Sequence, residues 1–289
     1  MSEIVNSFLK SIKFFNMIQH DIHTMQRNKG TFFVLGIDAA TWTVITPNLS
    51  KLRNFKRLIE IGKSKTVTLK EKPISASVWC GMFCGKTPEE HRHGSYAVNG
   101  EIVKREDIKV DFIWDVLARE GKKVKALNVP FVVPPYSFGV NFKPVGFGLP
   151  TNEREWQEEL ERVTEKTKEL LMEKPDLLIS VYTLLDRIQH FHWGEDYVVE
   201  WYKRMDEKIG ELIFDTGFLE EGERNKLIVI SDHGFCSFGE AKVQTLPEHT
   251  KEGKLKGDHH ENAFLVTVNV DYEIERPQDV FFAIKEDFY

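Results

Sequence analysis

The stretch VISDHGF, residues 229–235, places an aspartate and a histidine at the end of an apolar run. The run is part of NKLIVISD, residues 225–232, whose apolar content is typical of a buried strand. Asp232 and His233 follow the apolar residues directly, with Gly234 behind them. Because a buried carboxylate without a partner is unfavourable, we expect a bound group at the end of this strand.

Two earlier apolar runs also end on an aspartate. TFFVLGID closes on Asp38, and PDLLISVYTLLD closes on Asp186, with His190 four residues later. Segments with helical spacing separate the runs, so strands and helices alternate along the chain. This alternation predicts an α/β fold, a three-layer sandwich with a mainly parallel central sheet and helices on both faces. The other expected strands are 124–129 and 263–270, and the expected helices are 78–83, 110–121, 152–174 and 195–215.

The strand ends predict where a site should lie. In open parallel sheets, ligands bind outside the carboxyl ends of the strands. A further pair of histidines follows in KGDHHEN, residues 256–262, which we expect to be a loop before the last strand. The Pro/Gly-rich segment 129–152 is expected to be a long loop that could lie over this site. The residues expected to converge are Asp38, Asp186, His190, Asp232, His233 and His259.

This set of side chains predicts a metal centre. A lone aspartate at a strand end is more often a helix cap, but three buried carboxylates would repel one another. A divalent cation removes that repulsion. Carboxylate oxygens mixed with imidazole nitrogens suit zinc, with manganese or iron as alternatives, and six such ligands are enough for two ions.

A candidate nucleophile lies in KPISASVWCGMFCGKTPEEHRHG, residues 72–94. Ser75 precedes the apolar segment 78–83, which has the character of a helix. By itself, a serine at this position would be a helix-capping residue. Its role as a nucleophile depends on the likeness described below.

Composition and charge limit the remaining choices. A chain of 289 residues with 41% hydrophobic content can bury a large core, and we expect one catalytic domain over 31–289. A net charge of -6 argues against binding a nucleic-acid polymer. Three cysteines without a Cys-x-x-Cys pair indicate a reducing compartment, so we expect a cytoplasmic protein.

The N-terminal segment, residues 1–30, has one apolar face at helical spacing. We expect an amphipathic helix that packs on the domain or on a second subunit of a homo-oligomer. Its charges do not fit a signal peptide, and no stretch of the sequence is long and apolar enough for a transmembrane segment.

Five motifs in order resemble those of the alkaline phosphatase superfamily. They are GIDAATW, PISASVW with the following CG, P and H, LLDRIQH, SDHGF and GDH. The chain is most similar to the type I phosphodiesterase and nucleotide pyrophosphatase family, from residue 31 to the end. The resemblance implies an alkaline-phosphatase-like fold and an enzyme that cleaves small phosphodiesters or nucleotide pyrophosphates. It also implies two zinc ions and a phosphoserine intermediate. The implied ligands are Asp186, His190 and His259 for one ion, and Asp38, Asp232, His233 and the nucleophile Ser75 for the other.

The chain departs from the family pattern near the nucleophile. PEEHRHG carries extra residues where the family usually has His-Gly, and Asn99 is the candidate that remains for binding the phosphate. Ala76 follows Ser75 where nucleotide-cleaving members often have an aromatic residue, which leaves nucleotide specificity open. The alternatives are a phosphomonoesterase or phosphonate hydrolase on the same scaffold, and a metal-holding binding protein without turnover. We expect diesters to be preferred over monoesters.

Overall fold

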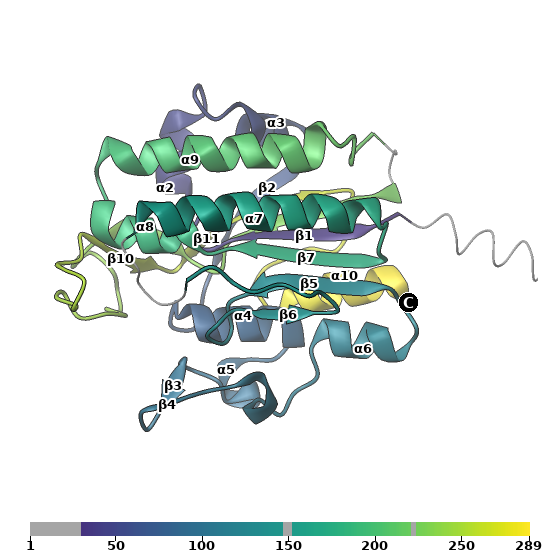
Figure 1. The fold of residues 1–289 in the computed structure, drawn as a ribbon, viewed down its shortest axis with the longest axis horizontal. Helices are drawn as coiled ribbons and strands as arrows, with labels where there is room; N and C mark the ends of the chain where they lie inside the picture. Colours follow the sequence, from purple (N-terminus) through teal and green to yellow (C-terminus); the bar gives the residue numbers. More distant parts are fainter. Residues whose placement is uncertain (1–29, 147–151, 221–223) are drawn as a thin grey trace, which may run out of the picture.

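A seven-stranded sheet forms the centre of the computed structural model, which describes residues 30–146, 152–220 and 224–289 (Figure 1). The strand order is β2-β11-β8-β1-β7-β5-β6. The predicted helix at 1–30 lies outside the described residues, apart from Gly30, and the division of the chain at residue 30 stays a prediction. The strands are β1 (Phe32–Ile37), β2 (Lys63–Thr68), β5 (Val124–Val129), β6 (Tyr136–Phe138), β7 (Leu177–Tyr182), β8 (Lys226–Ile230) and β11 (Asn262–Val268).

The central strands run parallel, as predicted. β1 pairs in parallel with both β7 and β8, and β5 pairs in parallel with β7. β11 is antiparallel to β8 and to β2, and β6 is antiparallel to β5. In the register of the sheet, Gly36 of β1 lies beside Val181 and Ile230. The three aspartate-bearing strands therefore end at the same edge.

Helices cover both faces of the sheet (Figure 1). Alternate residues of β1 explain the two layers: Phe33 and Leu35 face one core, while Phe32 and Val34 face the other. Both faces are buried, which accounts for the continuous apolar runs in the sequence. The first core is covered by α3 (Arg53–Ile61), α7 (Glu153–Met172), α8 (Leu184–His192) and α9 (Asp196–Ile209), and the second by α4 (Ser75–Cys84), α6 (Ile113–Arg119) and α10 (Asp279–Phe288).

Several strands were not expected from the sequence, among them β2, β6 and a strand over residues 257–260. β2, with the sequence KSKTVT, is an edge strand that pairs with β11, and most of its side chains are exposed or half-buried. β6 lies inside the Pro/Gly-rich segment that was predicted to be a loop. GDHH was also predicted to lie in a loop, but it forms β10 (Gly257–His260), which pairs with β9 (Gly234–Ser237). In each case a distant partner strand, rather than the local apolar pattern, determines the structure.

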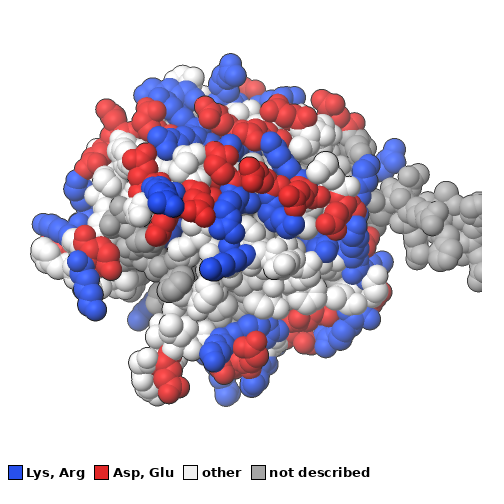
Figure 2. All heavy atoms as spheres, in the orientation of Figure 1, with Lys and Arg blue, Asp and Glu red and all other residues white. Residues whose placement is uncertain are grey.

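Charged side chains of both signs are interspersed over α7 and α9 on the face shown in Figure 2. Many of them are paired: Lys208 lies 2.9 Å from Glu161, and Arg204 lies 3.4 Å from Glu153. This pattern is typical of a solvated helix face rather than of a basic stripe for nucleic acid. Within the described part of the chain, no helix is both long and apolar enough to cross a membrane.

Candidate active site

Three buried carboxylates meet at the carboxyl edge of the sheet. Asp38 follows β1, Asp232 follows β8, and Asp186 lies in the first turn of α8 after β7. Trp79 Nε1 donates to Asp38 Oδ2 at 3.1 Å, and the backbone N–H of Ala39 donates to Asp232 Oδ1 at 3.2 Å. The remaining oxygens, Asp38 Oδ1 and Asp232 Oδ2, are buried without a hydrogen bond, and so is Asp186 Oδ1. Each carboxylate thus keeps one oxygen free for another partner.

Three imidazoles present their Nε2 atoms to the same place. The Nδ1 atoms of His190, His233 and His259 lie 3.1, 2.9 and 2.6 Å from the backbone carbonyl oxygens of Gly257, Gly234 and Pro73. A carbonyl oxygen can only accept, so each Nδ1 carries the proton and donates. In the neutral form of each ring, Nε2 then has a free lone pair, which is the arrangement found in histidines that bind metal.

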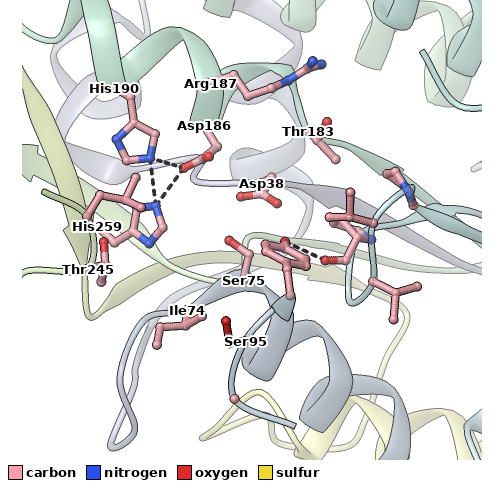
Figure 3. Close-up of a pocket in the computed structure, with 17 residues that line it drawn as sticks. Asp38, Ile74, Ser75, Ser95, Thr183, Asp186, Arg187, His190, Thr245 and His259 are labelled. Carbon is pink, nitrogen blue, oxygen red and sulfur yellow. Dashed lines mark hydrogen bonds and ion pairs between the residues drawn. The ribbon is translucent and has the colours of Figure 1, made fainter. Parts of the chain in front are cut away.

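Asp186, His190 and His259 form a tight triangle (Figure 3). The Nε2 atoms of His190 and His259 lie 3.0 Å apart. Asp186 Oδ1 is 3.1 Å from His259 Nε2 and 3.4 Å from His190 Nε2. Two lone pairs and a carboxylate oxygen at this separation repel one another unless a proton or a cation lies between them.

His233 connects this triangle to the other two carboxylates. Its Nε2 is 3.3 Å from Asp232 Oδ2 and 3.7 Å from Asp38 Oδ1, and its ring stacks on that of His259 with centroids 3.8 Å apart. Donor atoms of Asp38, Asp232 and His233 all lie within 4.8 Å of one another. The same holds for Asp186, His233 and His259, so His233 adjoins both groups.

The pKa values of these groups show what burial does to the site. Burial, with the charges of Asp232 and Asp186, raises the pKa of Asp38 well above its usual range. Burial and Asp186 also raise the pKa of Asp232 to about 6. Burial opposes ionisation of Asp186 too, yet His190 and His259 hold its pKa well below the usual value. Burial and His259 lower the pKa of His233 to about 3. The carboxylates need a positive charge that His233 does not supply, and divalent cations fit this donor set.

Ser75 lies beside His233. Its Oγ is 3.1 Å from His233 Nε2, and Ser75 is the first residue of α4, at the positive end of the helix dipole. One turn further along α4, Trp79 holds Asp38 in place. A Cβ on Gly36 would come within 2.7 Å of the Trp79 ring, so only glycine in β1 leaves room for this indole. The helix that carries the candidate nucleophile therefore also orients one of the carboxylates.

Neighbouring histidines in β10 have different surroundings. His259 lies at the triangle, whereas His260 Nε2 is 3.7 Å from Glu261 Oε2. Successive residues of a strand point to opposite sides, which separates the two side chains. The predicted role of His259 as a ligand thus agrees with its position, although the role itself stays a prediction.

Asn99 is not brought to this site. It lies exposed in the turn between β3 (Ala97–Val98) and β4 (Glu101–Ile102), and it lines a separate hollow with Arg92 and Asp107. Its position does not support the predicted role in binding phosphate, because Asn99 does not line the cavity at Ser75. The residues PEEH of PEEHRHG form the helix α5 (Pro88–His91).

Tyr96 occupies the place beside Ser75 instead. Its hydroxyl donates to the carbonyl oxygen of Pro130 at 2.8 Å, and Ser75 lies within hydrogen-bonding reach of it. Burial and the nearby aspartates raise the pKa of Tyr96 well above its usual value, so the hydroxyl stays protonated. No local sequence pattern indicates a role for this residue, because only the fold brings residues 96 and 130 together.

The sequence matches the family model described as type I phosphodiesterase / nucleotide pyrophosphatase over residues 32–287. The chain belongs to this family. The predicted class, a metal-dependent hydrolase of phosphoric esters in the alkaline phosphatase superfamily, is thereby confirmed at the level of the family. Among proteins of curated function, no sequence matches significantly.

Solved structures of other members of this superfamily share the fold. Murine ectonucleotide pyrophosphatase / phosphodiesterase 5 superposes with a TM-score of 0.62 at 13% identity, covering 89% of this chain and 94% of that one. Phosphonoacetate hydrolase from Sinorhizobium meliloti 1021, in complex with phosphonoformate, gives 0.64 at 12% identity, with 90% and 96% covered. A 2-O GAG sulfatase, BT1596, gives 0.57 at 10% identity, with 86% and 68% covered. The predicted alkaline-phosphatase-like fold is confirmed.

Proposed function

We propose that the chain hydrolyses phosphodiesters through a phosphoserine at Ser75, in a site that holds two divalent metal ions. One observation carries the proposal. Three buried carboxylate oxygens without hydrogen bonds and three imidazole lone pairs surround the hydroxyl of one buried serine. Without cations this arrangement is electrostatically unfavourable, and with them every donor has a partner.

We divide the ligands between the two ions as the family resemblance implies. Asp186, His190 and His259 would hold one ion. Asp38, Asp232 and His233, with Ser75, would hold the other. Mixed oxygen and nitrogen donors suit zinc, with manganese or iron as alternatives. When bound, two ions would lower the pKa of the serine hydroxyl and neutralise charge on the phosphoryl group.

The residues then have separate tasks in an in-line displacement. Ser75 Oγ forms a bond to phosphorus while the bond from phosphorus to the departing ester oxygen breaks, and an alcohol leaves. The phosphoryl group on Ser75 keeps the second ester group of the substrate. Water then attacks this phosphorus, which releases a phosphate monoester and restores Ser75. With substrate bound, the hydroxyl of Tyr96 would turn its single proton from the carbonyl oxygen of Pro130 to a non-bridging phosphoryl oxygen, and the N-terminus of α4 favours negative charge beside Ser75.

The charge of the surroundings favours diesters over monoesters. Among the described residues that line the cavity at Ser75, Arg187 is the only lysine or arginine. Its guanidinium is ion-paired with the buried carboxylate of Glu159. A monoester dianion carries one more negative charge than a diester and would find no unpaired cationic side chain here.

The experiment compares matched substrates on protein stripped with chelator and reloaded with zinc or manganese. We expect metal-dependent release of p-nitrophenol from bis(p-nitrophenyl) phosphate. Mass spectrometry after acid quench should show a Ser75 peptide that carries a p-nitrophenyl phosphoryl group. Ser75→Ala should retain metal and lose both signals. Faster turnover of p-nitrophenyl phosphate or of a phosphonate would assign the chain to those substrates instead. Hydrolysis that persists in chelator, or in Ser75→Ala, would refute the proposal.

A further inference from the structure

Beside Ser75 the candidate site opens into a cavity of about 380 Å³ (Figure 3). This volume lies within the range of pockets that bind small organic molecules, roughly 300–1,000 Å³. Asp38, Asp186, His190 and His259 line one end of the cavity. Its other walls are largely apolar, with the aliphatic residues Ile74, Pro130, Val132, Val133, Pro135 and Leu246 and the polar residues Ser95, Tyr96, Thr183 and Thr245.

Two segments that are distant in sequence build the aliphatic walls. Residues 130–135 follow directly after β5, and Tyr96 is fixed to this segment by its hydrogen bond to Pro130. Leu246 comes from the long loop between β9 and β10, where Thr245 is bound to Asp258: its backbone N–H donates to Asp258 Oδ2 at 3.0 Å. Asp258 is buried and adjoins His259, so the loop is held close to the candidate metal ligands.

The cavity offers no free cation to a second anionic group of a substrate. Arg187 lies on its lining, but the side chain extends from α8 away from Ser75 in Figure 3 and pairs with Glu159. Glu159 also accepts from the backbone N–H of Thr183 at 2.6 Å and from its hydroxyl at 3.0 Å. Both members of the ion pair are almost fully buried, so their charges cancel locally.

We propose that this cavity binds an apolar alkyl or aryl substituent of the phosphodiester, rather than a nucleoside or a second phosphoryl group. The inference rests on the proposed function, since it takes the phosphorus to lie at Ser75. An apolar substituent that packs against aliphatic walls is removed from water, and this burial makes the free energy of binding more favourable. A nucleoside would bring hydroxyl and amide groups against valine and proline side chains, where they would lose hydrogen bonds to water without replacement.

Calorimetry of O-alkyl methylphosphonates on the zinc-loaded protein tests the inference, because their alkoxides are poor leaving groups and the ester can be checked for integrity after each titration. These monoanions differ only in the length of one alkyl chain. From the methyl to the hexyl ester, Kd should fall by up to about fourfold for each buried methylene group. The thymidine 5′-ester of the same acid should bind more weakly than the hexyl ester. A Kd independent of chain length, or tighter binding of the thymidine ester, would overturn the inference.

Two variants in the loop between β9 and β10 test whether Leu246 contacts the alkyl chain. Leu246→Gln replaces a half-buried side chain of the cavity and should flatten the dependence of Kd on chain length. Val243→Gln is the control, because Val243 is 38% exposed and does not line the cavity. The same dependence in Leu246→Gln as in the wild type would overturn the assignment. Hydrolysis of bis(p-nitrophenyl) phosphate, measured in parallel, separates this failure from failure of the proposed function.

Discussion

Asp232→Asn should have opposite effects on stability with and without metal. The substitution keeps the size of the side chain and removes its charge. Asp232 is fully buried, and Asp232 Oδ2 has no hydrogen bond. In the metal-free protein the buried charge therefore destabilises the folded wild type, and the variant lacks this charge. With metal bound, the same charge is a ligand that the variant cannot provide.

The size of the effect follows from the pKa of Asp232, which burial and Asp186 raise from 3.8 to about 6. At neutral pH this corresponds to about 3 kcal/mol of destabilisation of the folded, metal-free protein by the ionised carboxylate. Because the folded pKa lies above the unfolded one, the protonated form stabilises the fold below pH 3.8, and this stability is lost as the pH rises through 6. The advantage of the variant should therefore grow from nearly zero at pH 4 to about 3 kcal/mol at pH 7.

Urea unfolding of both proteins, in chelator and with zinc, measures this difference. Both proteins carry the same histidines, so their titration largely cancels in the comparison. Zinc at 1,000 times its dissociation constant should add about 4.1 kcal/mol to the wild type and much less to the variant, so that the order of stability reverses. A variant that is less stable than the wild type by the same amount in chelator and in zinc would refute the reasoning.

Three further predictions concern turnover. His259→Ala should lower kcat/KM on the order of 100-fold or more and reduce the zinc content measured by mass spectrometry, with His260→Ala close to wild type; equal losses would contradict the placement of β10. Tyr96→Phe should lower kcat by about 100-fold at unchanged zinc content, since a donor to the phosphoryl oxygen is lost, and an unchanged kcat would remove Tyr96 from the site. Methyl p-nitrophenyl phosphate should give a higher kcat/KM than p-nitrophenyl phosphate, and the reverse order in steady-state kinetics would favour the monoesterase.

The sheet and its site-bearing edge could be predicted because the signals there are local and strong. β1, β7 and β8 are buried on both faces, so each appears as an unbroken apolar run. Each run is followed by an aspartate, and parallel pairing then brings Asp38, Asp186 and Asp232 together without further information. The order of the five motifs also indicated the family, and the match of the family model to residues 32–287 confirms it.

Other features depend on contacts between residues that are far apart in the sequence, and no local sequence pattern predicts such contacts. Four polar residues, GDHH, form β10 only because β9 supplies partners for their backbone groups. Tyr96 reaches Ser75 because the chain after α5 folds back onto residues 130–131, where a ring nitrogen of His93 lies 2.6 Å from the carbonyl oxygen of Phe131. Asn99 is the candidate for binding phosphate that follows PEEHRHG, where the extra residues of this chain disturb the alignment with the family. The turn that carries it has the exposed location usual for a hairpin tip.

The loop between β9 and β10 leaves its hairpin at Ser237 and returns at Gly257, two residues that pair directly. Leu246 in this loop faces the cavity, whereas His259 belongs to the strand behind it. Because strand pairing orients His259, residues between 239 and 255 can change in number or kind while the hydrolytic groups keep their positions. The loop is thus the segment in which related enzymes could diverge in substrate preference, and the natural place to graft a new specificity onto unchanged chemistry.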